Sequence, residues 1–131
     1  MRDGIDALAG ARVLVVEDAA LLAMLAEAHL ISFGCEIADV AATAVEALEI
    51  IRGAEIHVAL LDISLREGTS FGVADALAKK GVPYVFVTGH DRDKLPEEHS
   101  GAPLIQKPYE PKELRSAILQ ILGVGLSLRG E

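Results

Sequence analysis

The feature that most constrains this sequence is a regular alternation of short apolar runs with segments that carry apolar residues at helical spacing. Neighbouring parallel strands need a long crossover, usually a helix, whereas antiparallel strands can be joined by a two-residue turn. Strand-length runs that alternate with helices therefore predict a parallel sheet, covered by helices on both faces through right-handed crossovers.

Five runs are predicted to form the strands of this sheet. They are rich in Val, Ile and Leu, as strands buried on both faces are. The predicted strands are Arg12–Asp18, Cys35–Ala41, His57–Asp62, Pro83–Gly89 and the short run from Pro103 to Pro108.

Helices are predicted between the strands from apolar spacing and from end signals. The first covers Ala19–Phe33, and its expected core face consists of Leu21, Met24, Leu25 and Ala28. The second follows Thr43, a suitable N-cap residue, and ends near Gly53. A third helix is expected before Gly81, with an apolar face of Val73, Ala74 and Leu77.

The last third of the chain contains a weak helical segment and a strong one. The segment from His90 to Gly101 is polar and contains Pro96, so its helix is expected to be short or frayed. Pro111 suits the first position of a final helix, and the expected core face consists of Leu114, Ala117, Ile118 and Ile121. The residues after Leu122 are predicted to form a short tail.

The strand and helix pattern predicts an α/β fold in one domain. A chain of 131 residues has the length of one ordinary domain. Five strand–helix units fit the flavodoxin-like, doubly wound five-stranded parallel sheet of order 2-1-3-4-5. We expect a single domain over residues 1–131, with a core at about 12–122 and short tails. Such sheets bind ligands beyond the carboxyl ends of the strands, where the order reverses between strands one and three.

The composition excludes several classes of partner. Twenty acidic and twelve basic residues give a net charge of -8, which repels nucleic acids. The N-terminus lacks the apolar core of a signal peptide, and no run approaches the roughly 18 apolar residues of a membrane span. The single cysteine, Cys35, fits a reducing compartment and is expected to be a small buried apolar residue. We therefore expect a cytoplasmic protein with no membrane or nucleic-acid contact.

Polar residues end four of the predicted strands at the same edge of the sheet. Glu17 and Asp18 end the first strand, Asp62 the third, Thr88 the fourth and Lys107 the fifth. Because the carboxyl ends of parallel strands meet at one edge, the three carboxylates are expected within several Å of one another.

Crowded carboxylates need a compensating charge. At about 4 Å two unit charges repel by roughly 4 kcal/mol at an effective dielectric near 20. Mg²⁺ prefers one or two carboxylates, water and a phosphate as ligands. Lys107 offers a positive charge and Thr88 a hydroxyl donor, which suit a phosphoryl group on a carboxylate nucleophile. Taken alone, Asp18 would most often be a loop or capping residue, Thr88 a strand or turn residue and Lys107 a solvated side chain, but their combination favours a site.

These residues give the chain a strong resemblance to the CheY-like receiver domain of two-component response regulators. The matching motifs are "ED" at 17 and 18, "VALLD" ending at 62, "VFVTG" around 88 and "KP" at 107 and 108. The resemblance extends from about Arg12 to Leu122.

The resemblance implies a role for each site residue. Asp62 corresponds to the phosphoacceptor, and Thr88 and Lys107 to the residues that sense and neutralise the phosphoryl group. The implied Mg²⁺ ligands are Glu17, Asp18, Asp62 and the backbone carbonyl of Ser64. No other cofactor is implied.

The function implied is a stand-alone receiver without a DNA-binding output domain. A sensor histidine kinase or a phosphotransfer protein donates the phosphoryl group, and contacts with a downstream effector protein change as a result. The domain is then a switch that catalyses its own phosphorylation and dephosphorylation, not an enzyme with a separate substrate. The small and apolar residues Ala19, Ala20, Leu22 and Ala23 either dock the kinase helices or pack in the core.

Some residues depart from the common receiver pattern. Leu104 stands where many receivers carry an aromatic switch residue. The run "PYVFVTGHD" resembles the FATGUY subgroup, which is associated with HWE-type kinases and general stress or light signalling, mostly in alphaproteobacteria. His90 occupies a position that influences acyl phosphate hydrolysis in the family, or is an exposed loop histidine. Pro108 is expected to follow a cis peptide bond, and Gly68 either permits a tight turn or is a plain loop residue.

Three alternatives remain at this stage. The first is a receiver-like binding module that works without phosphorylation, which the presence of all five site residues disfavours. A flavin-phosphate binder needs a Ser, Thr or Gly-rich loop after the first strand, where this chain has "EDAALL". An aspartyl phosphatase needs a second Asp at position 64, where this chain has Ser64.

Overall fold

The computed structural model describes residues 8–89 and 95–128, with side chains described up to Leu122. Its main sheet has five parallel strands in the order β2-β1-β3-β6-β7, which is 2-1-3-4-5 in the predicted numbering. The strands are β1 (Arg12–Val16), β2 (Glu36–Ala41), β3 (Val58–Asp62), β6 (Tyr84–Thr88) and β7 (Leu104–Gln106). The predicted doubly wound fold is therefore confirmed.

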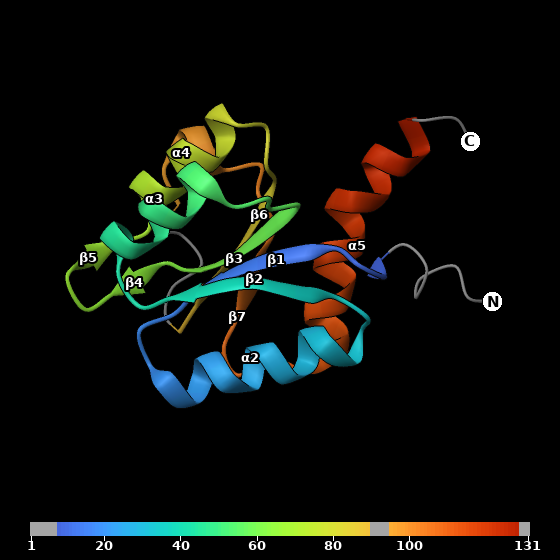
Figure 1. Ribbon diagram of the computed structural model, residues 1–131, viewed down its shortest axis with the longest axis horizontal. Coiled ribbons are helices and arrows are strands. Elements are labelled where there is room, and N and C mark those ends of the chain that lie inside the picture. The colour runs from blue at the N-terminus through green and yellow to red at the C-terminus, as the bar shows by residue number, and fades with distance from the viewer. Residues whose placement is uncertain (1–7, 90–94, 129–131) are drawn as a thin grey trace.

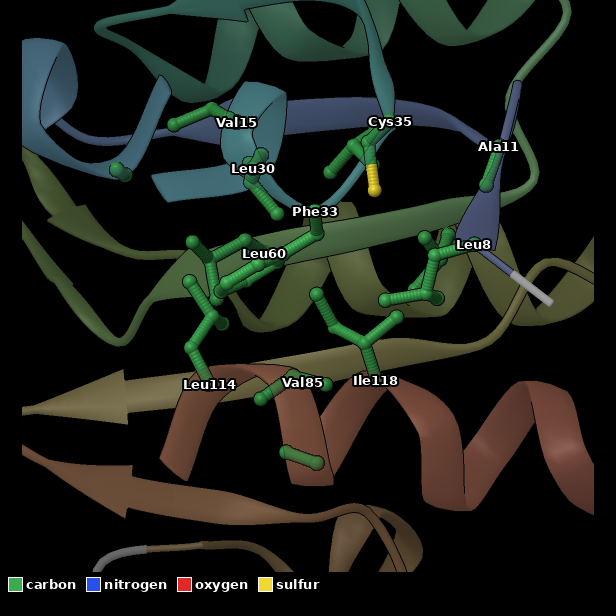
Figure 2. Close-up of a cluster of buried hydrophobic side chains, with 14 of the residues drawn as sticks. Leu8, Ala11, Val15, Leu30, Phe33, Cys35, Leu60, Val85, Leu114 and Ile118 are labelled. Carbon is green, nitrogen blue, oxygen red and sulfur yellow. The ribbon is translucent and has the colours of Figure 1, made fainter. Parts of the chain in front are cut away.

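Helices cover both faces of the sheet (Figure 1). They are α2 (Ala20–Ser32), α3 (Ala44–Gly53), α4 (Phe71–Lys79) and α5 (Pro111–Leu128). Helices α2 and α5 pack on one face, and α3 and α4 on the other. Figure 2 shows the core under α2 and α5, where Leu30 and Leu114 meet strand residues such as Val15 and Leu60. Cys35 lies in this core, as predicted.

The predicted core face of the first helix is wrong. The buried residues of α2 are Ala23, Ala26 and Leu30. Three members of the predicted face are exposed, with relative accessibilities of 68% for Leu21, 62% for Met24 and 48% for Leu25, and Ala28 is exposed as well. Apolar residues lie on all sides of this helix, so spacing alone cannot select the buried face.

Two other segments differ from the predictions. The loop predicted at 63–70 contains a small antiparallel pair, β4 (Ser64–Leu65) and β5 (Gly68–Thr69). Gly68 directly follows the two-residue turn at 66–67 and has a φ of 137°, which favours glycine, so the prediction that it permits a tight turn is confirmed. The tail predicted after Leu122 instead continues α5 to Leu128. Glycines weaken a helix by about 1 kcal/mol each, but do not by themselves end it.

The helix expected between β6 and β7 is short, as predicted. Within the described residues this segment contains one 3-10 turn, η2 (Glu97–His99). The buried His99 ring fixes the turn, with Nδ1 2.7 Å from the Tyr84 hydroxyl and Nε2 2.9 Å from Asp75 Oδ1. The ring also stacks on Phe71 at 6.0 Å. His90, which was predicted either to influence acyl phosphate hydrolysis or to be an exposed loop residue, lies outside the described residues.

No described helix is both long enough and apolar enough to cross a membrane.

Thr43 caps α3, as predicted, through a reciprocal pair of hydrogen bonds. The Glu46 backbone N–H donates to Thr43 Oγ1 at 3.1 Å, and the Ala42 N–H donates to Glu46 Oε1 at 2.8 Å. We expect Thr43→Ala to lower the free energy of unfolding by about 1 kcal/mol, because it leaves a helix N–H without its acceptor. Urea denaturation measures this change. Thr43→Ser keeps the acceptor and is the control; equal losses in both variants would contradict the capping role.

Candidate functional site

The predicted site residues lie together at the carboxyl edge of the sheet. Glu17 directly follows β1, Asp62 and Thr88 are the last residues of β3 and β6, and Lys107 directly follows β7. Strands β1 and β3 are adjacent in register, with Val16 opposite Leu61, so their ends are neighbours. The residues Glu17, Asp62 and Thr88 are buried, at 8%, 7% and 4% relative accessibility.

Backbone hydrogen bonds beyond the strand ends hold this edge in place. The Glu17 N–H donates to the Ala41 carbonyl at 3.0 Å, and the Lys107 N–H donates to the Thr88 carbonyl at 2.7 Å. The peptide bond between Lys107 and Pro108 is cis, as predicted. The site residues thus stand on an extension of the rigid sheet, which suits a group that must keep a fixed geometry.

Three carboxylates form the centre of the site. One oxygen from each of Glu17, Asp18 and Asp62 lies within 4.8 Å of the others. Asp18 does not cap α2, since Ala19 is the N-cap and makes no side-chain cap bond. Instead Glu17 Oε2 accepts the Ala19 N–H at 3.1 Å, which orients its carboxylate. The crowding predicted from the sequence is therefore confirmed.

Lys107 is the cation that joins these acids. Its Nζ donates to Glu17 Oε1 and to Asp62 Oδ2, both at 3.1 Å. Burial alone lowers the pKa of an ammonium group, but the hydrogen bonds and attraction of Glu17 and Asp62 outweigh it and raise the pKa of Lys107. Lys107 therefore stays charged and ties β7 to β1 and β3.

One ammonium does not fully compensate three carboxylates. Burial, followed by repulsion from Glu17, raises the pKa of Asp62 to about 6, although Lys107 acts in the opposite direction. A raised carboxyl pKa means that the negative charge of Asp62 is unfavourable here. The site consequently has an excess of hard oxygen ligands and of negative charge, and this donor set fits Mg²⁺.

Two further residues singled out from the sequence, Ser64 and Leu104, lie near the strand ends. Ser64 begins β4, two residues after Asp62, and is exposed. The predicted role of its backbone carbonyl in binding metal stays a prediction. Leu104 is half-buried and packs with the core under α3 and α4, opposite Phe86 in the sheet register.

Sequence reasoning missed two residues beside the site, His29 and Tyr109. Their rings meet edge to face with centroids 6.4 Å apart, and they join α2 to the segment after β7. Burial raises the pKa of Tyr109, with opposing effects from Lys107 and Glu17. Tyr109 follows the "KP" motif directly, which was the available signal, whereas His29 is brought close only by the tertiary fold.

The chain matches the family model of the response regulator receiver domain over residues 13–119. It is 34% identical over 114 residues to the phyllosphere-induced regulator PhyR of Methylorubrum extorquens. That match covers 84% of this chain and 43% of PhyR, so the chain spans less than half of this curated relative.

Solved structures agree with this match. The solution structure of SdrG from Sphingomonas melonis has a TM-score of 0.77 and 32% identity, and the alignment covers 86% of this chain and 97% of SdrG. The receiver domain of PhyR from Erythrobacter litoralis has a TM-score of 0.76 and 30% identity, over 88% of this chain and 92% of that one. PhyR from Brucella abortus has a TM-score of 0.81 and 26% identity, over 98% of this chain and 54% of that one.

The raised pKa of Asp62 predicts a pH-dependent effect of Asp62→Asn. Folding favours the protonated carboxyl, so this contribution to stability is complete below the unfolded pKa near 4 and is lost as pH rises through about 6. Asn cannot ionise. We therefore compare the free energy of unfolding of Asp62→Asn with that of the wild type in the absence of divalent cations. The difference should shift in favour of Asp62→Asn by about 1–2 kcal/mol when the pH is raised from 5 to 8.

Urea denaturation at both pH values measures this gain, with Asp39→Asn as a control at an exposed aspartate on β2. A stability difference between wild type and Asp62→Asn that does not change with pH would contradict the interpretation.

Proposed function

Because this chain belongs to the response regulator receiver family, we propose that it is a phosphorylation switch whose phosphoacceptor is Asp62. The phosphoryl donor is a histidine of a sensor kinase or of a phosphotransfer protein. The observation that carries this proposal is the contact of Lys107 Nζ with Asp62 at 3.1 Å inside a buried cluster of acids. An aspartate with a cation on one oxygen, at a rigid strand end, is suited to receive a phosphoryl group.

The proposed transfer uses Asp62 as the nucleophile. With a pKa of about 6, the carboxyl is ionised roughly ten to one at pH 7, so it can attack without a separate base. The bond between the donor imidazole nitrogen and phosphorus breaks while the bond from an Asp62 oxygen to phosphorus forms, and the imidazole keeps the electron pair. Lys107 balances the charge of the product, and Thr88 offers a hydroxyl donor for a phosphoryl oxygen.

Mg²⁺ is the proposed cofactor. Glu17, Asp18, Asp62 and the backbone carbonyl of Ser64 would hold it, and when bound it would supply positive charge against the phosphoryl oxygens. The excess of carboxylates over Lys107 supports this part of the proposal.

The proposed output is a change in protein contacts with an effector. The match to SdrG covers 97% of that solved chain, so the receiver unit alone accounts for the similarity. A PhyR structure from Bartonella quintana is described as an anti-anti-sigma factor, and this chain covers 53% of it. We therefore propose that this chain takes part in signalling of the PhyR type. Its phosphoryl donor would be a kinase of the HWE type.

The exposed apolar face of α2 supports kinase docking beside the site. Leu21 and Met24 are among the most exposed large apolar residues of the described chain, and α2 begins just after Asp18.

Leu21→Glu should slow phosphotransfer from a histidine kinase that phosphorylates the wild type, by about tenfold. Phosphorylation by acetyl phosphate should not change, because the acid cluster is intact. Val45→Glu, at an equally exposed site on α3 across the sheet, is the control. Equal kinase rates for wild type and Leu21→Glu would contradict docking through this face.

Incubation with acetyl phosphate tests the phosphoacceptor directly. With Mg²⁺ present, intact mass should rise by one phosphoryl group in the wild type and in Asp39→Asn, but not in Asp62→Asn. Without Mg²⁺ the yield should fall at least about tenfold, because three acids then oppose the incoming anion. No added mass in the wild type would favour the alternative, a receiver-like binding module that works without phosphorylation.

A further inference from the structure

A cavity of about 390 Å³ lies between α2 and the sheet, next to the acid cluster. Its floor is formed by core residues of three strands, Val15, Leu60 and Val87. Because the floor is part of the core, the cavity is a gap in packing that reaches the surface.

The gap follows from the small side chains on the buried face of α2. Ala23 and Ala26 face the sheet where a globular helix usually places Leu, Ile or Val, and Ala26 lines the cavity. Leu22 and Leu25 form the outer wall, and both are partly exposed. The cavity is open to the surface, so a ligand can enter it from solution.

The size and lining of the cavity suit a small organic ligand. Ligand pockets are typically about 300–1,000 Å³ and mostly apolar, with a few polar groups. An apolar cavity of about 150 Å³ already accommodates benzene, so a space more than twice as large has room for one or two rings. His29 and Tyr109 add aromatic side chains to the lining, with ring centroids 6.4 Å apart.

The charged end of the cavity restricts the ligand further. Glu17, Asp62 and Lys107 are its charged residues, and Lys107 is already bound to both carboxylates at 3.1 Å. Asp18 adds a third acid to the same cluster. An anionic ligand would meet net negative charge here, whereas an uncharged N–H or O–H group could donate to a carboxylate.

We propose that the cavity between α2 and the sheet is a binding site for a small uncharged aromatic molecule of one or two rings. The rings lie between Ala26 and the strand floor, and a polar hydrogen points toward Glu17 or Asp62.

Occupancy of the cavity is coupled to phosphorylation, because Glu17, Asp62 and Lys107 belong to both sites. This consequence rests on the proposed function, whereas binding itself does not. By linkage, a ligand that changes the affinity of the acid cluster for a phosphoryl mimic has its own affinity changed by the same factor.

Titration of the ¹⁵N-labelled protein with indole, followed by NMR and without Mg²⁺ or a phosphoryl donor, tests the binding site. We expect saturable shifts at the amides of α2 around Ala26 and at Lys107 and Tyr109. Indole-3-acetate carries the same rings and a negative charge, and should bind at least about tenfold more weakly.

Ala26→Leu should fill the cavity, weaken indole binding by about tenfold or more and raise the melting temperature. Ala28→Leu makes the same change at an exposed position of the same helix, outside the cavity, and should bind as the wild type does.

Absence of saturable shifts in the wild type would overturn the proposal, whatever the variants do. Binding that is unaffected in a folded Ala26→Leu variant, or shifts at α3 and α4 alone, would also overturn it. Phosphorylation by acetyl phosphate is measured separately, so failure of the binding site is distinguishable from failure of the phosphoacceptor role.

Discussion

The contact of one partly buried ammonium with two carboxylates organises this protein. Lys107 joins the ends of β1 and β3 to the segment after β7, at 3.1 Å from both Glu17 and Asp62. The sheet brings these groups together because all five strands are parallel and end at one edge. The charge balance stays negative, however, and the raised pKa of Asp62 records that imbalance. Because the cluster is negatively charged, it favours the binding of a further cation. Lys107 can then balance the negative charge of a phosphoryl group on Asp62.

The sequence carried enough information for the sheet and for most of the site. Strand ends at Glu17, Asp62, Thr88 and Lys107 were predictable because parallel strands have a shared direction, so residues far apart in sequence must meet. The buried face of α2 was not predictable from apolar spacing. Leu21 and Ala23 are both apolar, but only Ala23 is buried in the folded protein. The cavity was missed for the same reason, because a space between a helix and a sheet leaves no periodic signal.

The region between β6 and β7 shows how local weakness is compensated by tertiary contacts. A polar segment with Pro96 cannot sustain a long helix, and a single turn remains within its described part. That turn is held by His99, which is buried, bonds to Tyr84 and Asp75 and stacks on Phe71. Hydrogen bonds on both sides of the buried His99 ring satisfy its two nitrogen atoms, so the short turn can lie against the core.

The proposed switch requires that a cation, together with a phosphoryl group on Asp62, completes the acid cluster. Calorimetric titration with beryllofluoride, a phosphoryl mimic, tests this requirement. We expect one-to-one binding in the presence of Mg²⁺, and loss of binding without Mg²⁺ or in Asp62→Asn. Failure of the folded wild type to bind beryllofluoride with Mg²⁺ present, or unchanged binding in Asp62→Asn, would contradict it.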